Sequence, residues 1–132
     1  MTVVVDIIRV KTAGQYSAMA GLVMEYVQSL PFQLTFQDYQ AEIAALSQTY
    51  GPPAGKAFLA FDADEVIGCV GVRRLEDRIA ELKRLYVRPA GRGSGAGRGL
   101  TVAAVDAARS MGYEKIRLDT IGEMKVALAL YA

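Results

Sequence analysis

The chain has 132 residues, with 15 lysines and arginines against 14 aspartates and glutamates, so its formal net charge is +1. This length fits one domain, and a 52% hydrophobic share with 22% charged residues excludes an intrinsically disordered chain. A net charge this small provides no general attraction to nucleic acid or to an acidic membrane surface. We therefore expect a single domain over residues 1–132 with neither as a partner.

Two residue types restrict the chemistry further. The chain contains no histidine, which excludes Ser-His-Asp and Cys-His catalysis and any histidine-based metal site. Cys69 is the single cysteine and lies in an apolar strand pattern, so we expect a buried, inert thiol and no internal disulfide. We find no secretion signal and no apolar stretch long enough to span a bilayer, and we predict a cytoplasmic protein.

The first half of the chain predicts a strand, two helices and a hairpin. β-Branched residues at 3–10 indicate the strand, and helical spacing of apolar residues indicates a helix over 14–28. A second helix is predicted from Thr35, where Thr35 and Asp38 fit a loose capping box, up to Gly51. Residues 57–61 and 66–72 are two short apolar strands joined by a polar turn, typical of a hairpin.

The second half predicts a strand, a helix, a strand and a last helix. In the strand over 79–87, Leu82 and Leu85 break the alternation, and a β-bulge would bring both leucines to one face. A helix over 101–111 capped by Gly112, a strand over 115–119 and a helix over 122–131 follow. The predicted order is β-α-α-β-β-β-α-β-α, with the strands at 79–87 and 115–119 parallel.

Residues 88–100 contain the strongest functional signal. Glycines occupy alternate positions from Gly91 to Gly99, with Arg92 and Arg98 between them. Such a cluster indicates backbone angles or close approaches that a Cβ atom would prevent. A strand, a glycine-rich turn and a helix N-terminus together favour anion binding through outward N–H groups, and the arginines suit phosphate oxygens.

Two other phosphate-binding motifs are alternatives for this stretch. The nucleotide P-loop requires a lysine that the stretch lacks, so it does not fit. The dinucleotide fingerprint can be traced through Gly91, Gly93 and Ala96, with Asp119 at the end of the next strand as a ribose ligand. That interpretation would make the chain a fragment of a dinucleotide-dependent oxidoreductase.

A third pattern matches better. Residues 92–97, Arg-Gly-Ser-Gly-Ala-Gly, fit [RQ]-x-x-G-x-[GA], and this chain resembles the GNAT N-acetyltransferase superfamily there. Leu85-Tyr86-Val87-Arg88-Pro89 before the motif, and residues 124–131 after it, are also similar to that family. The resemblance implies an α/β (α+β) fold of the GNAT acyl-CoA N-acyltransferase type, with a mixed central sheet flanked by helices. It also implies transfer of acetyl from acetyl-CoA to a primary amine of a small molecule or peptide.

The resemblance assigns roles to particular residues. Backbone N–H groups of the loop would hold the pyrophosphate of the coenzyme, and the backbone of residues 85–87 would pair with its pantetheine arm. Glu81 would be the general base through water and Tyr131 the general acid. Glu81 could instead be a structural carboxylate paired with Lys83, Arg73 or Arg84, and Tyr131 an aromatic covering the core. The coenzyme-binding set is Leu85, Tyr86, Val87, Arg92, Gly93, Ser94, Gly95, Ala96, Gly97 and Arg98.

Two departures from the family pattern carry expectations of their own. Met124 stands where many relatives have a cofactor-binding asparagine, and the family normally continues past the tyrosine with two further strands, whereas this sequence stops at Ala132. We therefore expect a domain incomplete at its C-terminus, with the strand over 115–119 as an open edge. That edge predicts a homodimer or aggregation, and it leaves an acyl-CoA-binding module without turnover as an alternative function.

Overall fold

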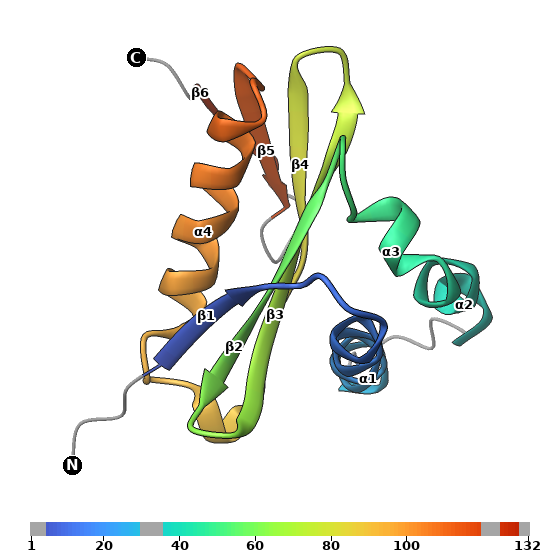
Figure 1. Cartoon of the computed structure of the whole chain (residues 1–132), viewed down its shortest axis with the longest axis vertical. Coiled ribbons are helices and arrows are strands. Elements are labelled where there is room, and N and C mark those ends of the chain that lie inside the picture. The colour runs from blue at the N-terminus through green and yellow to red at the C-terminus, as the bar shows by residue number, and fades with distance from the viewer. Residues whose placement is uncertain (1–4, 30–35, 120–124, 130–132) are drawn as a thin grey trace.

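The computed structural model describes the backbone of residues 5–29, 36–119 and 125–129, and the side chains of residues 5–29 and 40–118. Strands and helices follow one another along the chain as Figure 1 shows. The first half consists of β1 (Val5–Arg9), α1 (Ala13–Ser29), α2 (Phe36–Ala44), α3 (Leu46–Thr49), β2 (Lys56–Asp62) and β3 (Glu65–Glu76). The second half consists of β4 (Ile79–Val87), the 3₁₀ turn η1 (Pro89–Gly91), α4 (Ala96–Ser110), β5 (Lys115–Asp119) and β6 (Lys125–Ala129).

The six strands form one sheet in the order β1-β2-β3-β4-β5-β6. All neighbouring pairs are antiparallel except β4 and β5, which are parallel and connected by α4 as predicted. A dinucleotide-binding domain of the doubly wound type needs a mainly parallel sheet. The topology therefore excludes the oxidoreductase interpretation of the glycine loop.

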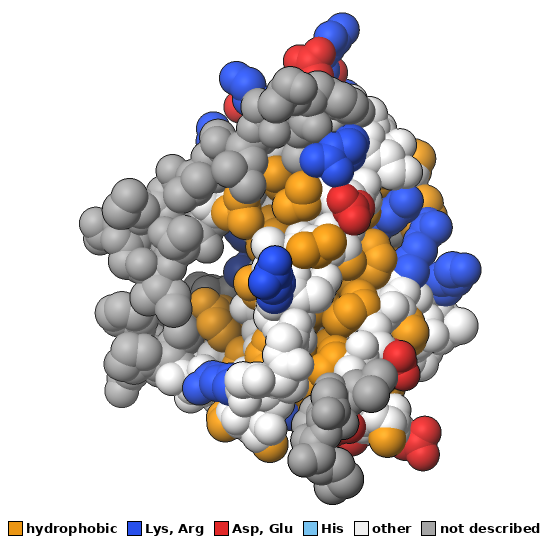
Figure 2. All heavy atoms as spheres, turned by 90° about the vertical axis from the view of Figure 1, so that its left-hand side faces the viewer, with side chains coloured by type: hydrophobic (Ala, Val, Ile, Leu, Met, Phe, Trp, Pro, Cys, Tyr) orange, Lys and Arg blue, Asp and Glu red, His pale blue; other side chains and the backbone are white. Residues whose placement is uncertain are grey.

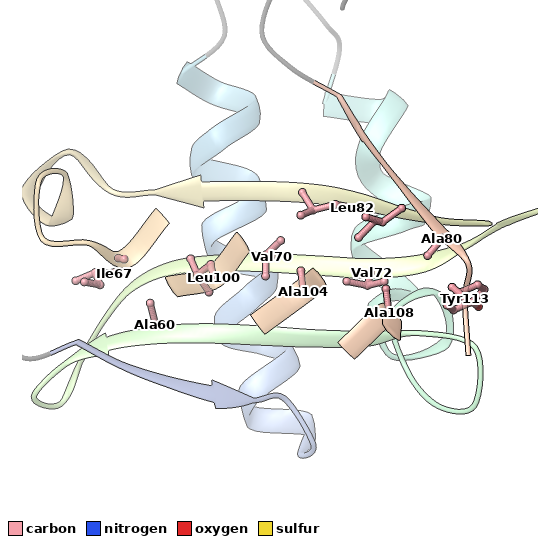
Figure 3. Packing of buried hydrophobic residues seen from close by; sticks show 12 residues of the cluster. Ala60, Ile67, Val70, Val72, Ala80, Leu82, Leu100, Ala104, Ala108 and Tyr113 are labelled. Atoms are coloured by element: carbon pink, nitrogen blue, oxygen red, sulfur yellow. The ribbon is translucent and has the colours of Figure 1, made fainter. Parts of the chain in front are cut away.

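The sheet separates two hydrophobic cores. Helix α4 lies on one face and helices α1 to α3 lie on the other (Figure 1). On the α4 side, Leu100, Ala104 and Ala108 pack against strand residues such as Val70 and Val72 (Figure 3). The opposite core has fully buried residues from α1 and from the end of α3, including Met19, Leu22 and Tyr50.

The α4 side of the molecule carries a band of hydrophobic side chains among charged ones (Figure 2). Val5, Ile7, Phe58 and Val105 pack against the core on this side but are only partly buried. Among the described side chains, the large hydrophobic ones that are exposed are Leu85 and Val102, at 38% and 51%. Helix α4 therefore covers the β1–β2 edge of the sheet incompletely.

The predicted hairpin, bulge and helix end are confirmed. β2 and β3 pair antiparallel around the turn at Ala63, and Gly112, which follows the C-cap residue of α4, adopts a φ of 91°. In β4 the register steps from Lys83 opposite Gly71 to Tyr86 opposite Cys69, so β4 contains one extra residue there. Leu82 is buried, but Leu85 is exposed, because β5 no longer accompanies β4 at that point.

The last predicted helix is wrong. Residues 125–129 form strand β6, which pairs antiparallel with β5 from Asp119 opposite Lys125 to Lys115 opposite Ala129. Met124, Ala127 and Leu130 are spaced as on a helix, but Val126 and Leu128 also alternate with alanines as a strand requires. Pairing with β6 satisfies backbone groups along the edge of β5, which decides between the two periodicities.

This pairing also overturns the expected open edge. Since β6 covers β5, the edge that predicted a homodimer is closed from within the chain. Thr35, the proposed helix cap, lies outside the described residues. No helix among the described residues is long and apolar enough to cross a membrane.

Candidate active site

The glycine-rich loop leads from the end of β4 into α4. After η1, Arg92 is extended, and Gly93 and Gly95 adopt φ values of 83° and 91°, in the left-handed region where a Cβ atom is strained. Gly95 is the residue that precedes α4, and Ala96 begins the helix. The alternating glycines thus serve, at two positions, to turn the backbone from the strand into the helix N-terminus.

Several N–H groups of this loop have no acceptor among the described residues. The N–H groups of Ser94, Ala96 and Gly99 donate within the loop or helix. Those of Gly93, Gly95, Gly97 and Arg98 have no such bond in the described part of the chain. Helix N-termini leave such donors free and carry partial positive charge, so these four groups are donors available to an anion.

Gly97 supports this interpretation because the fold gives no reason for a glycine there. It lies in the first turn of α4, and its φ is not in the left-handed region. A Cβ atom at this position would meet only Val87 Cγ2, at an ordinary 3.7 Å. Glycine destabilises a helix by about 0.5–1 kcal/mol relative to alanine. The motif accepts glycine or alanine at this position, so a small residue here leaves the start of α4 open to a ligand.

β4 and β5 separate beside this loop. Their pairing runs from Ile79 opposite Lys115 to Leu82 opposite Leu118 and ends there, and β5 diverges from β4 in Figure 3. Residues 85–87 therefore have no β5 partner among the described residues. An extended ligand arm could hydrogen-bond along this edge in the manner of an added strand.

The arginines around the loop have different partners. Arg88 binds Glu25 of α1 through Nε and Nη2 and also donates to the Val66 carbonyl, at 2.9 Å. Arg92 Nε donates to the Val87 carbonyl at 3.2 Å, on the strand edge itself. Arg92 and Arg98 are exposed, and neither forms an ion pair with a described residue. Both charges remain for an anion at the loop.

Glu81 lies on β4 and is 5% exposed. Its Oε1 accepts a hydrogen bond from Arg73 Nε at 3.1 Å, and it lies 3.0 Å from Arg73 Nη2 and 3.8 Å from Lys83 Nζ. Arg73 stands directly opposite Glu81 on β3, so the pair is a cross-strand one. The alternative partnership expected from the sequence is therefore present with Arg73 and Lys83, whereas Arg84 pairs elsewhere.

The likeness to known proteins agrees with this geometry. The family model "Acetyltransferase (GNAT) family" matches residues 21–132. An uncharacterized N-acetyltransferase of Schizosaccharomyces pombe is 35% identical over 129 residues, covering 96% of this chain and 79% of that protein. An uncharacterized N-acetyltransferase of Escherichia coli is 36% identical over 89 residues, covering 65% of this chain and 53% of that protein. The chain belongs to the GNAT acetyltransferase family.

Solved structures show the same fold at lower identity. A GNAT-family acetyltransferase from Staphylococcus aureus superposes with a TM-score of 0.73 at 21% identity, covering 89% of this chain and 74% of the other. A GNAT-family acetyltransferase from Brucella melitensis, solved in complex with acetyl-CoA, gives 0.71 at 19% identity, covering 96% and 88%. The GNAT fold expected from residues 92–97 is thus shown.

Within this GNAT domain, the sequence analysis missed two ion pairs that connect helices to β4 and to Arg88, the residue directly after β4. Glu25 reaches Arg88 from α1, and Glu42 reaches Arg84 from α2. The partners are 63 and 42 residues apart, and no local spacing indicates them. Cys69 is fully buried, as expected, and burial raises the pKa of its thiol to about 12.

The remaining site expectations are only partly covered by the structure. Tyr131 and Met124 lie outside the described residues. No group of three potential metal ligands occurs among the residues described. A cleft of about 350 Å³ between α1 and the α2–α3 pair, lined by Tyr16, Ile43 and Leu46 among others, lies apart from the loop.

Proposed function

We propose that this GNAT protein transfers an acetyl group from acetyl-CoA to a primary amine of a small molecule or peptide by direct attack. The observation that carries the proposal is the set of unpartnered N–H groups in the loop, next to the strand edge at residues 85–87. An anion cradle beside an open strand edge suits a ligand with a pyrophosphate and an extended amide-containing arm.

In this proposal the loop and the strand edge bind different parts of acetyl-CoA. The N–H groups of Gly93, Gly95, Gly97 and Arg98 hold the pyrophosphate, and the arginines add charge. The residues 85–87 bind the arm and orient the thioester. The amine nitrogen then attacks the acetyl carbonyl carbon, an N–C bond forms, and the C–S bond breaks to release the coenzyme as a thiolate.

Two proton transfers complete the reaction. A base must take a proton from the amine, and an acid must protonate the leaving thiolate. We assign the base to Glu81 through water and the acid to Tyr131, on the family resemblance. In the ligand-free chain Glu81 is paired with Arg73 and Lys83, so the assignment requires that a water or the acceptor shares its second oxygen.

The same ion pair favours a second candidate, an acyl-CoA-binding module without turnover. A carboxylate committed to Arg73 would be structural, and coenzyme binding would persist without a base. Two measurements separate the candidates. Calorimetric titration with acetyl-CoA tests binding, and release of the free thiol across a panel of amines tests turnover. Binding with thiol release supports the enzyme, binding without release supports the module, and absence of binding refutes both.

A further inference from the structure

The bulge in β4 is centred on Arg84, which adopts a left-handed φ of 59°. A residue with a side chain is strained in that conformation, and surrounding contacts must hold it there. One such contact comes from β3, where the thiol of Cys69 donates to the Arg84 carbonyl at 3.3 Å. The bulge immediately precedes residues 85–87, the strand edge assigned to the coenzyme arm.

A second contact comes from the α2 side. Arg84 Nε donates to Glu42 Oε2 at 2.5 Å, and Arg84 Nη2 donates to Glu42 Oε1 at 3.0 Å. The two side chains are only 16% and 17% exposed. A bidentate arginine–carboxylate pair of this kind fixes the orientation of both side chains, and low exposure reduces the screening of their charges by solvent.

Glu42 is itself held in place. The hydroxyl of Tyr50 donates to Glu42 Oε1 at 3.1 Å, and Tyr50 is fully buried. Its ring lies against Gly71, where a Cβ atom would come within 2.6 Å of Tyr50 Cδ1. Gly71 pairs with Lys83, the residue before the bulge. The contacts therefore run from Gly71 on β3 to Tyr50, from Tyr50 to Glu42, and from Glu42 to Arg84 on β4, the strand that pairs with β3.

The charges around Glu42 support the same arrangement. Burial acts to raise the pKa of Glu42, but the hydrogen bond and charge of Arg84, with the Tyr50 hydroxyl, outweigh it and the pKa lies below its ordinary value. The carboxylate is thus held ionised as a partner of Arg84.

We propose that Arg84 is a positioning residue, whose ion pair with Glu42 sets the bulge so that residues 85–87 present their backbone edge to the coenzyme arm. This inference rests on the proposed function. It makes Glu42, which belongs to α2, a determinant of coenzyme binding that acts through Arg84 and does not touch the ligand.

The test uses two variants and a matched control in the full chain. Glu42→Ala removes the anchor, and Arg84→Gly removes the side chain while accepting the left-handed φ without strain. Glu114→Ala breaks a different ion pair, with Arg78 at 2.7 Å, away from the bulge. Each protein is measured for the dissociation constant of acetyl-CoA, by calorimetry, and for amide hydrogen exchange at residues 84–87 without ligand.

Glu42→Ala should weaken acetyl-CoA binding by about tenfold or more, since misplacement of about 1 Å in a positioned site has effects of up to a hundredfold. It should also speed exchange at residues 84–87, while Glu114→Ala changes neither. The Glu42→Ala/Arg84→Gly double variant should bind acetyl-CoA no more weakly than the weaker-binding of the two single variants, because both substitutions remove the same ion pair. Glu42→Gln, which keeps hydrogen-bonding atoms, should restore part of the affinity.

Two results would overturn this inference. Wild-type affinity and exchange in Glu42→Ala would show that the backbone alone sets the bulge. Independent, additive losses in the two single variants would show that Arg84 and Glu42 do not act together. Failure of the unaltered chain to bind acetyl-CoA would instead refute the proposed function, and the inference with it, so the two failures are distinguishable.

Discussion

Replacing Gly97 by valine should separate the needs of the fold from those of the ligand. The motif accepts glycine or alanine at this position, so the test needs a branched side chain. The new Cβ atom would meet only Val87 Cγ2 at 3.7 Å, an ordinary contact, and the backbone there is helical. Valine has a somewhat higher helix propensity than glycine, so the free protein should keep its stability to within about 0.5 kcal/mol. For a chain of this size that corresponds to a change of no more than roughly 2 °C in the melting temperature.

The branched side chain should interfere with the coenzyme. Its methyl groups would hold a phosphate away from the unpartnered Gly97 N–H, and the loss of a hydrogen bond to a charged group is worth about 1.5–3 kcal/mol. The dissociation constant of acetyl-CoA should then rise about tenfold to a hundredfold, at 1.4 kcal/mol for each factor of ten. Calorimetric titration measures the affinity, and differential scanning calorimetry measures the stability of the free protein.

Gly21 offers a matched control. It lies within α1, and a Cβ atom there would meet nothing within 4 Å. Gly21→Val should change the stability of the free protein to a similar extent without changing its affinity for acetyl-CoA. If Gly97→Val binds acetyl-CoA as tightly as the unaltered chain, the loop does not hold the pyrophosphate at that position, and the reasoning from the glycine loop fails.

Three further outcomes are expected. Arg92→Ala should weaken acetyl-CoA binding about tenfold in calorimetry, since one charge-assisted contact is lost, and a loss confined to low salt would contradict direct contact. Glu81→Gln should lower kcat most at low pH, where the amine most needs a base, and an unchanged pH–rate profile would leave Glu81 with a structural role only. Because burial raises the pKa of Cys69 from 9.0 to about 12, the folded state keeps a proton that the unfolded state releases. Stability should thus fall as pH rises from about 9 towards 12 and fall less in Cys69→Ala, as denaturant titrations would show.

Most of the fold could be predicted from local sequence. The hairpin, the helix that follows the glycine loop and the parallel step from β4 to β5 depend on periodicity, turn residues and connection length, which act over a few residues. The bulge at Arg84 was indicated in the same way by the spacing of Leu82 and Leu85. The glycine loop was predictable because left-handed turns demand glycine.

The rest depends on partners that are distant along the chain. Residues 125–129 satisfy two periodicities, and pairing with β5 selects the strand. Glu42 and Arg84 are separated by 42 residues, so only the packing of α2 against the sheet brings them together. Glu81 was equally suited to catalysis and to an ion pair on its sequence. The cross-strand position of Arg73 shows the ion pair, while its catalytic role stays a prediction.

Amide NMR of the labelled protein during titration with acetyl-CoA tests the central claim most directly. If the loop is the coenzyme cradle, the N–H signals of Gly93, Gly95, Gly97 and Arg98 should show the largest saturable shifts, since hydrogen bonding to phosphate oxygens acts on those protons. The signals of residues 85–87 should follow with the same dissociation constant. Saturable shifts confined to the cleft between α1 and α2, with the loop signals unmoved, would contradict the account.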